Sequence, residues 1–181
     1  MSDQDYGKKE IETEDLIPFI EAYEYVTGQR LDIIKRIENP DFICQNSKGI
    51  TIGVELTKVM RDPRDASWDR IIERKYEMSA YDSLETITHL IKKKEVARSK
   101  RYITKVKESI LVLQLIDGSL TGLKPFLNDL IDDFKDHGFS EIWLADYTGF
   151  EAYGDIELFC LFPGKLWGYY QRPWPDRKPF G

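Results

Sequence analysis

Cysteine and long apolar runs are scarce in this sequence, and both absences narrow the class of protein. The chain of 181 residues has two cysteines, Cys44 and Cys160, each in an apolar run typical of a strand and without a Cys-x-x-Cys pattern. We expect buried free thiols in a reducing cytoplasm, with a disulfide as the alternative. No apolar run approaches the roughly 20 residues that span a bilayer. The stretch MSDQDYGKKEIETED is polar and acidic, with no apolar signal core, so we expect a cytoplasmic protein with no membrane segment.

Signatures of several enzyme classes are absent as well. The sequence has no Walker loop, no dinucleotide-binding glycine pattern and no Gly-x-Ser-x-Gly nucleophile elbow. Its two histidines, His89 and His137, show no HxxxH or HxH spacing, so we expect surface or helix-end positions for them. Nucleotide-dependent enzymes and hydrolases with a Ser–His–Asp triad therefore lack support.

Positive charge is in the minority but is concentrated. The net charge is −6, which argues against unspecific binding to nucleic acids. The segment from Lys92 to Lys107 nevertheless holds eight Lys or Arg residues and one acid, which leaves −13 on the rest of the chain. This segment either attracts a polyanion locally or is a solvated helix face.

The apolar periodicity predicts one domain over residues 1–181. Helical spacing is found at 14–28, 83–101 and 123–138, and strand patterns at 31–38, 41–44, 50–59, 109–116, 141–147 and 155–163. This order predicts an α/β fold with a central mixed β-sheet flanked by helices. Residues 1–14 form a polar N-terminal segment. Residues 163–181 form an aromatic, basic and proline-rich arm, which either stacks bases and holds phosphates or packs across its own domain or a neighbouring subunit.

Two carboxylates stand in apolar strands where core residues would be expected. In the strand at 50–59, Ile52 and Val54 share one face, while Glu55 lies on the other. Asp41 opens the preceding strand, and the turn residues between the two strands predict a hairpin that brings both acids together. Two close carboxylates repel unless one is protonated or a cation lies between them. Oxygen ligands of this kind suit Mg²⁺ or Mn²⁺, and the alternative is a pair of structural carboxylates that cap turns.

The residues Pro40-Asp41, followed by Gly53-Val54-Glu55-Leu56-Thr57, resemble the motif of the PD-(D/E)XK nuclease superfamily. In that superfamily a Pro-Asp opens one strand and an acid-x-Lys lies on the next. The resemblance covers roughly residues 15–115, where the order helix, three-strand meander, helix and strand agrees. It implies a restriction-endonuclease-like core and a Mg²⁺- or Mn²⁺-dependent endonuclease-like phosphodiesterase that acts on DNA or RNA.

The resemblance also implies a set of metal ligands. Asp41, Glu55 and the Leu56 carbonyl would hold the metal, together with an acid from the first helix. We choose Glu24 for that acid because it flanks the apolar stripe of the helix. Glu38 is an alternative as an outer ligand or a strand-end charge.

The position of the motif lysine is occupied by Thr57, which cannot supply an ammonium group. Some members of the superfamily carry this lysine on the following helix. In that helix, Lys94 falls at helical spacing within the apolar stripe of Leu84, Ile87 and Ile91. We therefore expect Lys94 to point toward the two carboxylates as the catalytic lysine, with a lysine that only extends along the helix end as the alternative.

Other cations of this helix are candidates for contacts to phosphates. They are Lys92, Lys93, Arg98, Lys100 and Arg101. Two functions follow for comparison: a metal-dependent nuclease with Asp41, Glu55 and Lys94 as its catalytic residues, and a non-catalytic relative that binds nucleic acid or protein. The oligomeric state is open, with a homodimer among the alternatives.

Overall fold

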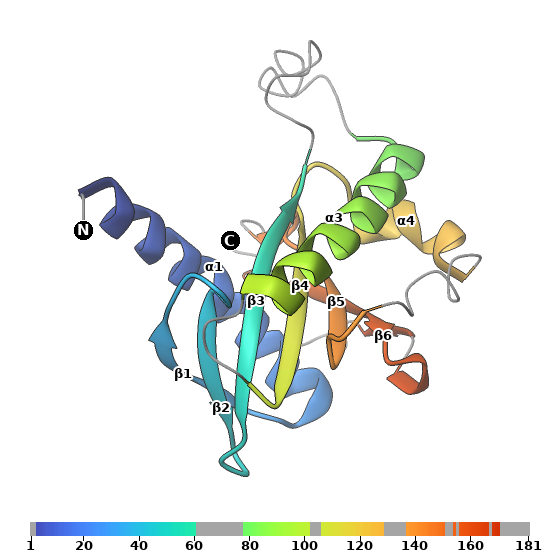
Figure 1. The fold of residues 1–181 in the computed structure, drawn as a ribbon. Helices are drawn as coiled ribbons and strands as arrows, with labels where there is room; N and C mark the ends of the chain where they lie inside the picture. Colours follow the sequence, from blue (N-terminus) through green and yellow to red (C-terminus); the bar gives the residue numbers. More distant parts are fainter. Residues whose placement is uncertain are drawn as a thin grey trace.

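In the computed structural model, helix α1 (Asp3–Thr27) covers one face of a mixed sheet, and helices α3 (Ala80–Arg101) and α4 (Leu120–Leu127) cover the other (Figure 1). The structure describes residues 3–60, 78–101, 106–128, 137–150, 154, 156–166 and 168–170. The predicted α/β fold with a central mixed sheet flanked by helices is confirmed. Within these ranges no helix is long and apolar enough to cross a membrane.

The sheet has seven strands whose spatial order is their order in the chain. They are β1 (Leu31–Arg36), β2 (Phe42–Asn46), β3 (Thr51–Val59), β4 (Glu108–Leu115), β5 (Glu141–Asp146), β6 (Glu157–Phe162) and β7 (Gly168–Tyr170). Strands β3, β4 and β5 are parallel to one another, and the remaining neighbours are antiparallel. Parallel neighbours need long crossover connections, and α3 and α4 lie in these two connections on the same face of the sheet.

Helix α1 builds the core on its own face of the sheet. Its side chains Leu16, Phe19 and Tyr23 are almost fully buried against alternate residues of the strands, including Ile52 and Val54. The helix ends at Thr27. Gly28 follows with a φ of +73° and donates its N–H to the Glu24 carbonyl, a conformation that glycine adopts without strain.

Helices α3 and α4 build the second core on the opposite face. Ile87 and Ile91 of α3 pack with Leu120 and Leu123 of α4 against inward residues of the parallel strands. The strands β4 and β5 are buried on both faces, as expected for parallel strands covered by helices on each side. The alternation expected for β3 is confirmed, because Val54 packs toward α1 and Val59 toward α3 and α4.

Several boundaries differ from the expected ones. Helix α1 begins at Asp3, so most of the polar N-terminal segment is helical rather than a separate tail. Helix α4 begins at Leu120, and residues 129–136 of the expected helix lie outside the described residues. In the C-terminal arm, Gly168–Tyr170 form an edge strand paired with β6, and residues 171–181 lie outside the described residues.

Gly53 in the middle of β3 permits a close approach of the preceding loop. A Cβ at this position would lie 2.9 Å from Cγ of Pro40 and 3.0 Å from Cγ2 of Val106. Any larger residue would therefore displace Pro40, the residue directly before Asp41. The glycine couples the packing of the sheet to the position of that carboxylate.

We expect Gly53→Ala to lower the free energy of unfolding by about 1–3 kcal/mol, because overpacking a closed site forces its neighbours to move. Gly122→Ala in α4 is the matched control, since its Cβ would meet only Ser119 Oγ at 3.7 Å. That variant should be neutral or slightly stabilising, because alanine has the better helix propensity. Urea unfolding of both variants measures the difference, and equal stabilities would contradict the close packing at Gly53.

Candidate metal centre

Asp41 and Glu55 are brought together by the pairing of β2 with β3. Phe42 pairs with Val54 in antiparallel register, so the next pair along the strands is Asp41 and Glu55. Strand β2 begins at Phe42, whereas β3 continues to Val59. The amide of Leu56 therefore has no partner in β2, and it donates to Asp41 Oδ2 at 2.9 Å instead. The Asp41 side chain thus takes the place of a β2 backbone acceptor at the edge of β3.

Lys94 reaches the same point from the helix above the sheet. Its Nζ lies 3.3 Å from Oε2 of Glu55, whose side chain is only 2% exposed. Ile87 and Ile91, on the same stripe of α3, are buried in the core on this face. The expectation that Lys94 points inward toward the carboxylates is confirmed. A buried carboxylate requires such a partner, because an isolated charge in an apolar layer costs several kcal/mol.

The three charged groups do not balance. Burial and, next, the neighbouring Glu55 carboxylate raise the pKa of Asp41 from an ordinary value of 3.8 to about 7. The Leu56 amide and the Lys94 ammonium oppose this rise without cancelling it. With both acids ionised, one ammonium faces two carboxylates. The site therefore favours either a proton or an additional cation.

The donor set fits a hard divalent cation. Both acids present oxygen atoms, and Leu56 adds a carbonyl, because the N–H and C=O of one residue in an extended strand point to the same edge. Within the described ranges, no group of three or more His, Cys, Asp or Glu residues is arranged to hold a metal. Two carboxylates are nevertheless sufficient for Mg²⁺, which keeps several waters and uses one or two protein carboxylates.

Glu24 does not join this site, and its prediction as a ligand requires correction. The side chain is exposed and belongs to α1, which packs on the face of Val54. Glu55 points to the opposite face, toward α3. The sheet therefore lies between Glu24 and the paired carboxylates.

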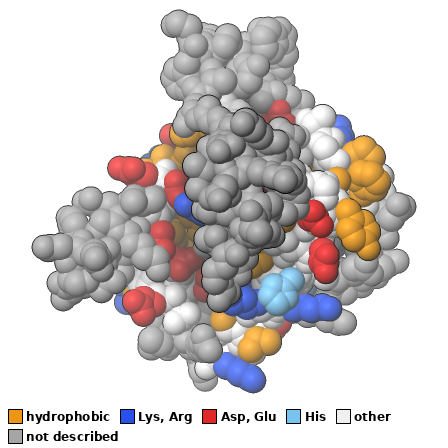
Figure 2. Space-filling model, turned by 90° about the horizontal axis from the view of Figure 1, so that it is seen from above, with side chains coloured by type: hydrophobic (Ala, Val, Ile, Leu, Met, Phe, Trp, Pro, Cys, Tyr) orange, Lys and Arg blue, Asp and Glu red, His pale blue; other side chains and the backbone are white. Residues whose placement is uncertain are grey.

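The basic residues of α3 divide into two groups. Lys92, Lys93 and Lys100 are exposed and available for contacts to an anion. In the view from above, basic side chains gather beside a histidine along one edge, and acidic side chains are distributed elsewhere over the described surface (Figure 2). The side chain of Arg101 lies outside the described residues.

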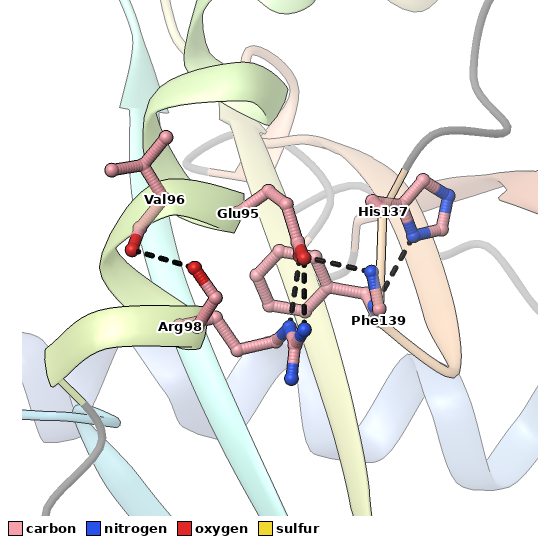
Figure 3. A network of polar contacts seen from close by, with 7 residues as sticks. Glu95, Val96, Arg98, His137 and Phe139 are labelled. Carbon is pink, nitrogen blue, oxygen red and sulfur yellow. Dashed lines mark hydrogen bonds and ion pairs between the residues drawn. The ribbon is translucent and has the colours of Figure 1, made fainter.

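Arg98 belongs to the second group and is engaged within the protein. Its Nε and one terminal nitrogen both donate to Glu95 at 2.8 Å, and the guanidinium lies 5.9 Å from the ring centroid of Phe139. Glu95 also accepts a hydrogen bond from the Gly138 amide at 2.9 Å (Figure 3). This bond links α3 to the residues just before β5. The prediction of Arg98 as a phosphate contact requires correction, because this guanidinium fastens the helix to the segment before β5.

A second buried polar group was not foreseen from the sequence. Tyr23 Oη donates to Oε2 of Glu141 at 2.8 Å, and Trp143 Nε1 donates to Oε1 at 3.0 Å. The available signal was a tyrosine on the apolar stripe of the first helix together with an acid at the start of a buried strand. Because the two are 118 residues apart, nothing in the local pattern joined them.

Comparisons with protein-family models, with curated proteins and with solved structures give no match.

We expect the stability of the metal-free protein to fall as the pH rises from about 4 to about 7, since folded Asp41 retains its proton where the unfolded chain has released it. Asp41→Asn removes this titration and should raise the free energy of unfolding at pH 8 by about 1 kcal/mol or more, with a smaller effect at pH 4. Urea unfolding across this pH range, with a chelator present, measures the difference.

Asp32→Asn is the control, because this exposed acid pairs with exposed Arg30, at 3.0 Å. Its effect should stay below about 1 kcal/mol. A difference between Asp41→Asn and the wild type that does not change with pH would contradict the charge imbalance.

Proposed function

We propose that this chain is a Mg²⁺- or Mn²⁺-dependent nuclease with a restriction-endonuclease-like core, which hydrolyses phosphodiester bonds of DNA or RNA. The observation that carries the proposal is the contact of Lys94 with Glu55 beside Asp41. An acid, a second acid and a lysine thus meet at one point, although Thr57 occupies the position of the motif lysine. The helix, three-strand meander, helix and parallel strand that surround this point support the same proposal.

Each group has a role in this proposal. Asp41, Glu55 and the Leu56 carbonyl would hold the metal. When bound, the metal would polarise the phosphate and lower the pKa of a coordinated water. The Lys94 ammonium stabilises negative charge that develops on the phosphate oxygens. The Leu56 amide keeps Asp41 in a fixed orientation through its hydrogen bond of 2.9 Å.

The exposed lysines of α3 supply the attraction for a polyanion. Lys92, Lys93 and Lys100 lie on the same helix as Lys94 and face solvent. Contacts of this kind bind the sugar-phosphate backbone without regard to sequence. We further propose a cytoplasmic location, which the free, buried state of Cys44 and Cys160 supports.

A non-catalytic relative of the same fold is the second candidate. The observation that favours it is the burial of Glu55, which is 2% exposed and already paired with Lys94. An ion pair of this kind also occurs as a purely structural link between a helix and a sheet. Such a protein would bind a nucleic acid or a protein partner through the α3 lysines, as a monomer or a homodimer.

We expect Mn²⁺ or Mg²⁺ to stabilise the wild type, because a ligand that binds only the folded state adds about 2.7 kcal/mol at 100 times its Kd. Asp41→Asn should lose most of this gain, since it removes one of the two carboxylates. Thermal unfolding with increasing metal at pH 8 measures the effect, with Asp32→Asn as the control that should respond as the wild type does. An unchanged response of Asp41→Asn would place the metal elsewhere.

We expect Lys94→Met to lower the rate of cleavage of a polynucleotide in Mn²⁺ by about 100-fold or more, as for loss of a group that stabilises developing charge. Methionine keeps much of the apolar length of the side chain, which limits the effect on packing. Single-turnover cleavage of DNA and RNA substrates, after the variant's thermal unfolding has been checked, provides the measurement.

Lys93→Met is the matched control on the exposed side of the helix. This variant should bind the polynucleotide slightly more weakly and with a slightly smaller salt dependence. The cleavage rate at saturating protein should not change. An equal loss of the cleavage rate in Lys94→Met and Lys93→Met would mean that the α3 lysines act only by attracting the polyanion. If the wild type binds Mn²⁺ but cleaves no polynucleotide, the non-catalytic relative becomes the better description.

A further inference from the structure

A cavity of about 510 Å³ lies on the face of the sheet that α1 covers, away from the paired Asp41 and Glu55. It is bounded by the last turn of α1, by the starts of β4 and β5, and by the segment that follows β6. Its lining includes Tyr23, Val26, Glu108, Glu141, Trp143, Lys165 and Leu166. The volume is within the range of cavities that bind small organic molecules.

The Glu141 carboxylate is held in a fixed position in this cavity. Tyr23 Oη lies 2.8 Å from Oε2 and 3.2 Å from Oε1, and Trp143 Nε1 donates to Oε1 at 3.0 Å. The two rings meet edge to face, with centroids 5.7 Å apart. A carboxylate oriented by two neutral donors has further lone pairs for a ligand.

The described lining of the cavity carries two carboxylates, Glu108 and Glu141, and one ammonium, Lys165, and therefore has an excess of negative charge. Among the described residues, neither Glu141 nor Glu108 makes an ion pair. Burial raises the pKa of Glu141, and the nearby Glu108 raises it further, against the lowering effects of the Tyr23 and Trp143 hydrogen bonds and of Lys165. Lys165 itself is exposed. A bound cation would relieve this excess charge.

We propose that the cavity binds a small organic cation, a guanidinium group on a short aliphatic chain. The guanidinium would donate to the Glu141 carboxylate, with Glu108 as a second counter-charge, because planar guanidinium and carboxylate groups match in bidentate geometry. The apolar side chains of Val26 and Leu166 in the same lining suit an aliphatic chain. The same lining offers carboxylates for the charged group and apolar side chains for the aliphatic chain of an organic cation.

Butylguanidine and its neutral isostere butylurea provide a matched pair of probes. The readout is the indole N–H signal of Trp143, assigned by comparison with Trp143→Phe, since this group donates directly to Glu141. We expect butylguanidine to shift the signal saturably and butylurea to bind at least ten-fold more weakly. Equal binding of both probes, or no saturable shift up to about 10 mM butylguanidine, would overturn the proposal.

Substitutions of the two carboxylates that line the cavity show which of them binds the guanidinium group. Glu141→Gln should weaken butylguanidine binding at least ten-fold, while Glu85→Gln, an exposed position on α3 across the sheet, should leave it unchanged. Glu108→Gln should weaken butylguanidine binding several-fold. This variant tests the proposal if Glu141→Gln does not fold. Wild-type affinity in a folded Glu141→Gln, or in Glu108→Gln when the former does not fold, would overturn the proposal. Asp41→Asn should bind the probe normally, which separates this site from the candidate metal centre.

Discussion

The ammonium of Lys94 and the carboxylate of Glu55 meet 3.3 Å apart between α3 and β3, in a layer that leucine and isoleucine side chains otherwise fill. The Glu55 carboxylate, which is 2% exposed, would not be stable there alone, because the removal of a single ion from water costs several kcal/mol. The pair therefore links α3 to β3. It also sets the electrostatics of the neighbouring Asp41, since one ammonium cannot neutralise two carboxylates at once. The rise in the pKa of Asp41 to about 7 follows from burial and from this shortage of positive charge.

Much of this arrangement could be predicted from the sequence, because it depends on two short periodicities. Alternation along β3 separates Val54 from Glu55, and this separation holds irrespective of how the helices pack. The helical period places Lys94 on the stripe of Ile87 and Ile91, so a buried stripe carries the lysine inward. The proximity of Asp41 to Glu55 also follows from local information, since a hairpin joins their strands. Predictions that use one period or one turn need no knowledge of distant contacts.

The errors arise where the answer depends on contacts that are remote in sequence. The helical period of α1 predicts the position of Glu24 around the helix. It does not predict which face of the sheet α1 covers. Arg98 shares the inward stripe with Lys94, yet its guanidinium pairs with Glu95, and the Gly138 amide donates to that same acid from 43 residues further along the chain. Glu141 finds Tyr23 across 118 residues. The sequence gives the type of each side chain and its position within its own element. It does not show which distant residue or face of the sheet that side chain meets.

The two polar centres follow one structural rule on opposite faces of the sheet. Asp41 lies immediately before β2, where β3 extends past its neighbour and leaves the Leu56 amide to be bonded by a side chain. Glu108 and Glu141 are the first residues of β4 and β5, where the apolar core of the α1 face gives way to the cavity. Acids are tolerated at these ends because amide, hydroxyl and indole groups can solvate them there, whereas Glu55, in the middle of β3, is paired with the Lys94 ammonium. The sheet thus separates the two candidate sites, and a ligand at one would have no direct contact with the other.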